Sequence, residues 1–277
     1  MFNRKKYKEF ALIQLKNRWK VAVLMTLIIM VVMKIFSIPA SSNTLSKLSL
    51  SELQELSTYS FQELMAYLGN TNGNGVLRFI KTVIQQLVNY VFTIASLNVF
   101  IKMSRSPDPV SLKTFFEGLN DWKKGILAGL WETFWVFIWA LISIPVSIAG
   151  VLLCFFIGLN ENITLIFTFI FMIAGFIPAI IKEISYSQIF YLVVEYPELS
   201  VRKAMKLSMK ITEGYKWEVF KTAFSFIGFF LLSALTLGIL DLWLTPFYQM
   251  TMTNVYHALL KDALETGKLN PRGIELI

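Results

Sequence analysis

One carboxylate, Glu132, interrupts an apolar run that extends from Gly125 to Ile157. A charged group inside such a run is costly to desolvate, so we expect it to face the interior of a helix bundle. A carboxylate in that position can serve a substrate or a proton that crosses a membrane. The structural alternatives are an ion pair with Lys221, at a similar depth, and a neutral buried acid.

Three amide side chains in a second apolar run, 76–101, can extend the same polar interior. They are Gln85, Gln86 and Asn89. On a helix they can line a path together with Glu132. The alternative is that they connect neighbouring helices by hydrogen bonds, which is a common use of amides in membrane proteins.

Signatures of enzymes are absent from the sequence. There is one histidine, His257, and one cysteine, Cys154, so neither a histidine-rich metal site nor an internal disulfide can form. Phosphate-binding loops, dinucleotide-binding loops and nucleophile elbows are also missing. We therefore expect no catalytic residues, cofactor or metal. His257, at the inner end of an apolar run, is expected to serve packing.

Basic residues recur beside tryptophan and next to apolar runs. In the segment 195–217, Val201, Ala204 and Met205 fall with Met209 on one helical face, while cations occupy another. Such a helix lies among lipid headgroups with its cations toward anionic lipid. The candidate contacts with anionic lipid are Arg202, Lys203, Lys206, Lys210, Trp19, Trp122 and Trp217.

The composition indicates a chain that is embedded in a membrane. Hydrophobic residues make up 55% of the 277 residues and charged residues only 16%, well below the roughly 25% charged residues of soluble domains. A span needs about 20 apolar residues. We predict an all-α bundle forming a single domain, 1–277, with six spans at 21–38, 76–101, 125–157, 163–181, 219–240 and 242–260.

The distribution of charge predicts the orientation of these spans. Of 26 Lys and Arg residues, 22 lie in four segments that would all be cytoplasmic, as the positive-inside rule requires. These segments are 1–20, 102–124, 182–221 and 261–277. We therefore expect a plasma-membrane protein with both termini in the cytoplasm. The net charge of +8 is better explained by anionic lipid than by nucleic acid.

The segment 39–75 is the one long piece that this topology places outside. Leu53, Leu56, Leu64 and Leu68 are at helical spacing, which predicts an amphipathic helix on the outer surface. That helix is interpreted either as a site for a membrane-protein partner or as packing on the bundle.

A threefold pattern runs along the chain. A lead segment ending in tryptophan precedes an outward-going span at 17–20, 120–123 and 215–218. Each returning span ends in a polar–aliphatic–aromatic triplet, at 98–100, 188–190 and 254–256. The pattern predicts three helical hairpins, each introduced by an interfacial helix. The alternative is that Trp and Lys recur simply as interfacial anchors.

Two further patterns lie in the third predicted span. Gly125 and Gly129 form a GxxxG pair, which permits close approach of another helix. Trp131, Trp135 and Trp139 form a stripe along one helical face. The stripe is interpreted as an aromatic packing or lipid-facing ridge, with a lipid-binding surface as the alternative.

From the fourth span onward the chain carries a set of recognisable local patterns. They are Pro178 before Lys182, Tyr186-Ser187, Pro197 with Ser200, Gly214 with Lys216, Phe226-Ile227-Gly228, Thr236 with Gly238, and the run Leu242-Trp243-Leu244 with Pro246-Phe247-Tyr248. By these residues the chain resembles the uncharacterised bacterial membrane family called domain of unknown function 975, and the lead 15–28 is also similar to that family. Departures occur at Ala179 and at Leu240-Asp241, where the family has small residues. The resemblance implies a multi-pass bacterial membrane protein and brings no catalytic residues.

These observations favour a non-enzymatic membrane protein, an accessory, scaffold or envelope-homeostasis component that acts through lipid and protein contacts. The alternative is a transporter or lipid-handling permease that uses Glu132 and the amides of the second span. An intramembrane enzyme ranks lowest, because no nucleophile is paired with a base.

Overall fold

The computed structural model describes residues 2–37, 75–157 and 160–269, and every element in this part of the chain is a helix. The prediction of an all-α protein is therefore confirmed. The amphipathic helix predicted within 39–75 lies outside the described residues. Contacts divide the chain into two compact units, Met1–Leu27 with Tyr90–Ile277, and Ile28–Asn89.

Within the described residues, the second unit contains parts of two helices. These are the C-terminal part of α2 (Trp19–Ser37) and the N-terminal part of α5 (Gly75–Arg105). The remaining parts of α2 and α5 belong to the first unit, as do the other helices that the structure describes.

Four helical stretches within the described residues are long and apolar enough to cross a membrane. They are Phe79–Arg105, Leu112–Cys154, Asn162–Glu195 and Lys216–Leu235. Two of the six predicted spans are not among the four. The first largely coincides with α2, and the sixth coincides with α13 (Asp241–Glu265). Polar residues such as Gln249, Thr253 and Asn254 dilute its hydropathy.

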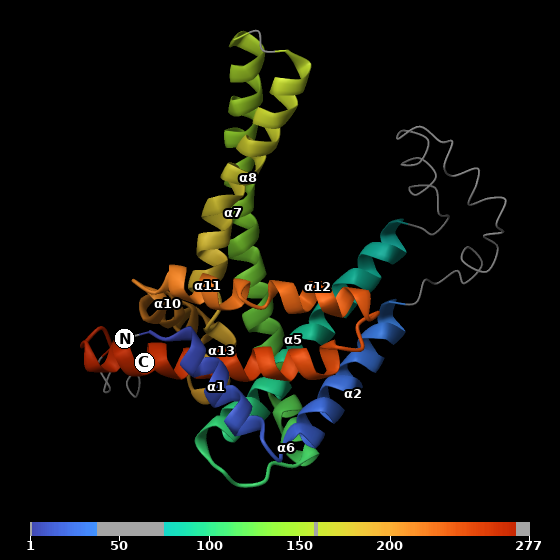
Figure 1. Cartoon of the computed structure of the whole chain (residues 1–277), viewed down its shortest axis with the longest axis vertical. Coiled ribbons are helices and arrows are strands. Elements are labelled where there is room, and N and C mark those ends of the chain that lie inside the picture. Colours follow the sequence, from blue (N-terminus) through green and yellow to red (C-terminus); the bar gives the residue numbers. More distant parts are fainter. Residues whose placement is uncertain (1, 38–74, 158–159, 270–277) are drawn as a thin grey trace, which may run out of the picture. The chain divides into compact units, whose positions relative to one another are not determined.

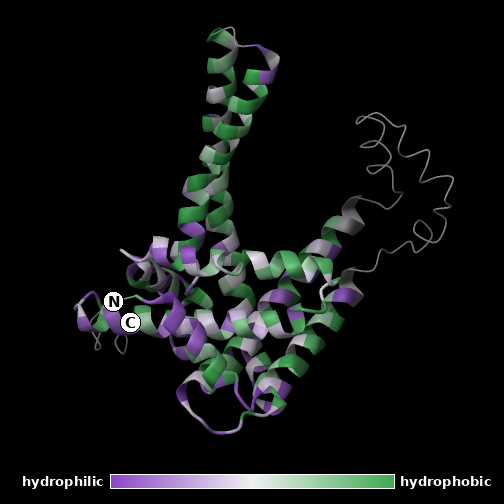
Figure 2. Cartoon of the chain, viewed as in Figure 1, coloured by the Kyte–Doolittle hydropathy of each residue, from purple (hydrophilic) through white to green (hydrophobic). Residues whose placement is uncertain are grey.

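The helices α7 (Trp122–Ile157) and α8 (Glu161–Tyr186) run side by side (Figure 1). Pro145 lies inside α7 and Pro178 inside α8. Both helices carry many exposed apolar side chains, and most of their length is hydrophobic (Figure 2). Apolar surface of this extent is uncommon on soluble proteins and is compatible with a lipid environment.

The fifth predicted span is divided into α11 (Lys216–Phe224) and α12 (Ile227–Leu235). The break falls at Phe226, whose ring is fully buried 5.2 Å from that of Phe247 and 5.3 Å from that of Tyr248. Phe247 and Tyr248 belong to α13, which α11 and α12 both contact. Packing against α13 thus accounts for an interruption that hydropathy alone does not reveal.

The remaining helices are short: α1 (Arg4–Leu15), α6 (Leu112–Gly118), η1 (Leu119–Asp121), α9 (Ile189–Glu195) and α10 (Val201–Thr212). The hydrophobic core of the first unit is formed chiefly by α9, α10 and α13, with residues of α5. At its centre the rings of Tyr191 and Tyr256 stack at 4.9 Å.

The GxxxG pair of α7, Gly125 and Gly129, packs against α5. A Cβ at Gly125 would lie 3.1 Å from the Tyr90 carbonyl oxygen, and one at Gly129 would overlap the Tyr90 ring. The predicted close approach is confirmed.

Candidate functional site

The helix α10 presents a basic surface on a fixed support. Its apolar face, which includes Val201, Ala204 and Met205, is buried against α7, α8, α9 and α13. Ser208 Oγ donates a hydrogen bond to the Ser185 carbonyl oxygen at 2.7 Å. The opposite face is exposed and carries the basic surface, defined as Arg202, Lys203, Lys206 and Lys210. The predicted division into two faces is correct, but protein rather than lipid covers the apolar one.

The tryptophan stripe of α7 packs against the core of the first unit. Cations from other helices lie over two of its rings. The Arg202 guanidinium lies 4.9 Å from the Trp131 ring centroid, and Lys182 Nζ lies 4.5 Å from that of Trp139. Cation–π attraction at such distances adds to packing. The stripe is therefore an aromatic packing ridge that fixes α10 and the C-terminal part of α8.

Glu132 is half-buried on α7. Lys221 is paired elsewhere, with its Nζ 2.5 Å from Glu218 Oε1 one turn away, so the pairing of Glu132 with Lys221 is not observed. Gln85, Gln86 and Asn89 lie on the part of α5 that belongs to the other unit. A polar path that joins these amides to Glu132 stays a prediction.

The three tryptophans proposed as lipid contacts begin helices. Trp19 is half-buried at the first residue of α2, and Trp122 is exposed at the first residue of α7. Trp217, in the first turn of α11, is 65% exposed. Its ring stacks on that of Phe220 at 5.2 Å.

An apolar groove of about 480 Å³ lies between α8 and α11 and is hereafter called the α8/α11 groove. Sequence analysis did not identify it. One wall is a stripe of isoleucines at helical spacing, and the other wall is the start of α11. The lining residues are Ile177, Ile180, Ile181, Ile184, Lys216, Trp217 and Phe220. The isoleucine spacing was the available signal, but it also fits any lipid-facing helix.

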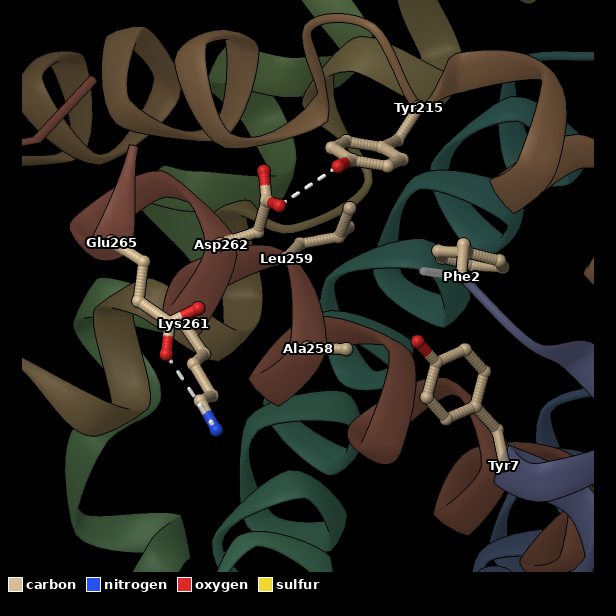
Figure 3. Close-up of a pocket in the computed structure, with 8 residues that line it drawn as sticks. All are labelled: Phe2, Tyr7, Tyr215, Ala258, Leu259, Lys261, Asp262 and Glu265. Carbon is tan, nitrogen blue, oxygen red and sulfur yellow. Dashed lines mark hydrogen bonds and ion pairs between the residues drawn. The ribbon is translucent and has the colours of Figure 1, made fainter. Parts of the chain in front are cut away.

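A smaller pocket, of about 210 Å³, lies between α1, the turn before α11 and α13 (Figure 3). The Tyr215 hydroxyl donates a hydrogen bond to Asp262 Oδ1 at 2.8 Å, which raises the pKa of Tyr215. Phe2 contacts the Tyr7 ring at 4.9 Å. Aromatic rings and carboxylates attract cations, and the chain supplies one itself: Lys268 Nζ lies 5.5 Å from the Tyr215 ring centroid.

Each of the three triplets contacts one of the helices that precede the three tryptophans. These helices, α1, α6 and α10, are hereafter called the lead helices. Asn98 Nδ2 donates to the Thr114 carbonyl oxygen of α6 at 3.0 Å. The Gln188 backbone N–H donates to Ser208 Oγ of α10 at 3.2 Å. Asn254 Nδ2 lies 2.8 Å from Gln14 Oε1 of α1. The helices α6 and α10 follow their triplet in the sequence, whereas α1 precedes its own by almost the whole chain.

Two of the leads end in the same turn. The backbone at Lys16-Asn17 and at Glu213-Gly214 follows type II geometry, with φ of +66° at Asn17 and +88° at Gly214. The closing hydrogen bonds, Arg18 N–H to Leu15 O and Tyr215 N–H to Thr212 O, are 2.9 and 3.0 Å long. A positive φ at the third turn position favours Gly and Asn. The second lead instead continues into η1.

The end of α5 is tied to two other helices and to the turn between α1 and α2. Arg18 of the first lead donates to the carbonyl oxygens of Met103 and Ser106, each at 2.8 Å. Ser104 Oγ lies 2.7 Å from His257 Nε2 of α13. Arg105 forms an ion pair with Glu195 of α9, whose side chain is 5% exposed. Sequence analysis missed this network because its members are far apart in the chain.

One comparison with known proteins gives a result. A family model described as "Protein of unknown function (DUF975)" matches residues 1–263. No curated protein and no solved structure matches the chain.

Proposed function

The chain belongs to the DUF975 family of proteins of unknown function, and we propose that it is a non-enzymatic multi-pass membrane protein that binds anionic lipid at its cytoplasmic side. In this role it serves as an accessory or scaffold component of the cell envelope. The observation that carries the proposal is the basic surface of α10, held in place by the buried opposite face.

The physical argument rests on preorganisation. A free amphipathic helix must order itself when it reaches the membrane, whereas α10 is already packed against α7, α8, α9 and α13. Its four cations are therefore presented without that entropic cost. Each Lys or Arg near an anionic membrane surface contributes about 1 kcal/mol, so four of them are sufficient to select anionic over zwitterionic lipid.

The topology proposed with this function is six spans in three hairpins, with α1, α6 and α10 as interfacial leads. It is supported by the four stretches that are long and apolar enough to cross a membrane. The contacts between the three triplets and the three leads support it further. In this arrangement, the basic surface of α10 lies on the same side as the segment 1–20, and both face the cytoplasm.

The test is the lipid content of the protein purified in mild detergent. We expect enrichment of anionic over zwitterionic lipid relative to the source membrane, measured by mass spectrometry. The variant R202Q/K203Q/K206Q/K210Q should lose at least half of that enrichment. The matched control R202K/K203R/K206R/K210R keeps every charge and should retain it. Equal enrichment in the two variants would overturn the proposal.

A further inference from the structure

We propose that the α8/α11 groove is a binding site for one anionic phospholipid, with an acyl chain along the isoleucines of α8 and the phosphate at Lys216. This deepens the proposed function, because it names a single bound lipid where the basic surface of α10 provides only general attraction. The two sites have no residue in common.

The lining of the groove fits a hydrocarbon chain. Four isoleucines at positions i, i+3, i+4 and i+7 form a continuous apolar wall along α8, and Phe220 faces them from α11. Both helices belong to stretches apolar enough to cross a membrane, so the solvent at this groove is lipid rather than water. A groove of about 480 Å³ is within the range of ligand sites.

One of the residues that line this apolar groove is a cation, Lys216. Lys216 makes no ion pair with any carboxylate in the described part of the chain. The nearby Lys221, in contrast, is neutralised by Glu218 at 2.5 Å. A lysine beside lipid chains requires an anionic partner or access to water, and a phosphate satisfies the first requirement.

The direction of the helices agrees with a lipid of the inner leaflet. In the proposed topology, α8 returns to the cytoplasm and α11 leaves it, so Ile184 and Lys216 both lie at cytoplasmic ends. Trp217, next to Lys216, is an interfacial residue by type and is 65% exposed. The phosphate is then at headgroup level, and the acyl chain extends from Ile184 toward Ile177.

The experiment is native mass spectrometry of the full chain in mild detergent, titrated with phosphatidylglycerol and, separately, phosphatidylcholine. We expect one high-affinity phosphatidylglycerol. Ile180→Trp places a bulky ring in the groove and should weaken binding about tenfold. Leu165→Trp is the control, because Leu165 is an exposed aliphatic residue of the same helix that lies outside the groove and on another helical face. The affinity of this control variant for phosphatidylglycerol should be unchanged.

The headgroup contact has its own variant. Lys216→Gln should reduce the preference for phosphatidylglycerol over phosphatidylcholine, whereas Lys216→Arg should keep it. Equal weakening by the two tryptophan variants, or an unchanged preference in Lys216→Gln, would overturn the proposal. So would the loss of a protein partner or a second copy from Ile180→Trp with lipid binding intact, because the groove would then be a protein interface.

The two proposals fail separately. In R202Q/K203Q/K206Q/K210Q the total enrichment of anionic lipid should fall, while the single high-affinity phosphatidylglycerol remains. If that one lipid is absent from the wild-type chain but enrichment is normal, the groove proposal alone is wrong. If the lipid is present but enrichment does not depend on the cations of α10, the function of the basic surface alone is wrong.

Discussion

Asn254 in α13 donates a hydrogen bond from Nδ2 to the backbone carbonyl oxygen of Tyr7 in α1, at 3.3 Å and across 247 positions of the sequence. Asn98 makes the corresponding contact with Thr114 across only 16 positions. The lead helix α1 therefore docks on α13, in the way that α6 docks on α5, the long helix just before it. Each lead helix thus contacts the triplet that precedes it in the chain, except that α1, which has no triplet before it, contacts the last one.

Removal of the Asn254 amide should destabilise the first unit. Asn254→Ala leaves the Tyr7 carbonyl oxygen and the Gln14 side chain without this donor, and losing a partially buried partner costs about 1–3 kcal/mol. We expect a lower midpoint of thermal unfolding in detergent. Asn120→Ala is the control, because Asn120 is an exposed amide. Equal midpoints for the two variants would contradict a structural role for the contact.

The close approach of α7 to α5 gives a second prediction. Gly129→Ala places a methyl group into the ring of Tyr90, and overpacking of this kind costs about 1–3 kcal/mol. Gly228→Ala in α12 is the matched control, since a Cβ there meets nothing within 4 Å. In a helix that change is neutral or stabilising by up to about 1 kcal/mol. The midpoint of urea or thermal unfolding should therefore fall for Gly129→Ala and should rise or stay unchanged for Gly228→Ala.

The GxxxG pair of α7, Gly125 and Gly129, also shows what a sequence can predict. The GxxxG spacing identified the contact because it depends on residues four positions apart on one helix. The two faces of α10 were predicted for the same reason. Both features are local, so the periodicity of one element contains the necessary information.

Features that depend on two distant elements were not predicted. The α8/α11 groove combines isoleucines of α8 with Lys216 and Trp217, and its existence depends on how the two helices pack. The break at Phe226 depends on rings in α13. An ion pair of Glu132 with Lys221 was one of the alternatives that similar depth suggested, but Glu218 is one turn from Lys221 and pairs with its ammonium instead.

The buried ion pair at the end of α5 should respond asymmetrically to substitution. Glu195 is 5% exposed, whereas Arg105 is 55% exposed. Arg105→Met leaves the carboxylate buried and unpaired, which costs about 3–5 kcal/mol for a fully buried pair and less here because the guanidinium reaches solvent. Glu195→Gln leaves an arginine that can turn to water. We expect Arg105→Met to lower the unfolding midpoint more, and the reverse order would contradict this assignment.

The orientation has a direct test that uses the chain's own single cysteine as background. Cys154 is buried, with 2% of its surface exposed, so it should react slowly with a membrane-impermeant maleimide. A cysteine at Ser57 should be labelled from outside intact cells, because the positive-inside rule places 39–75 there. A cysteine at Ser200, beside the basic surface of α10, should be labelled only after the cells are opened. Labelling of Ser200→Cys in intact cells would reverse the orientation, and both lipid sites would then face outward.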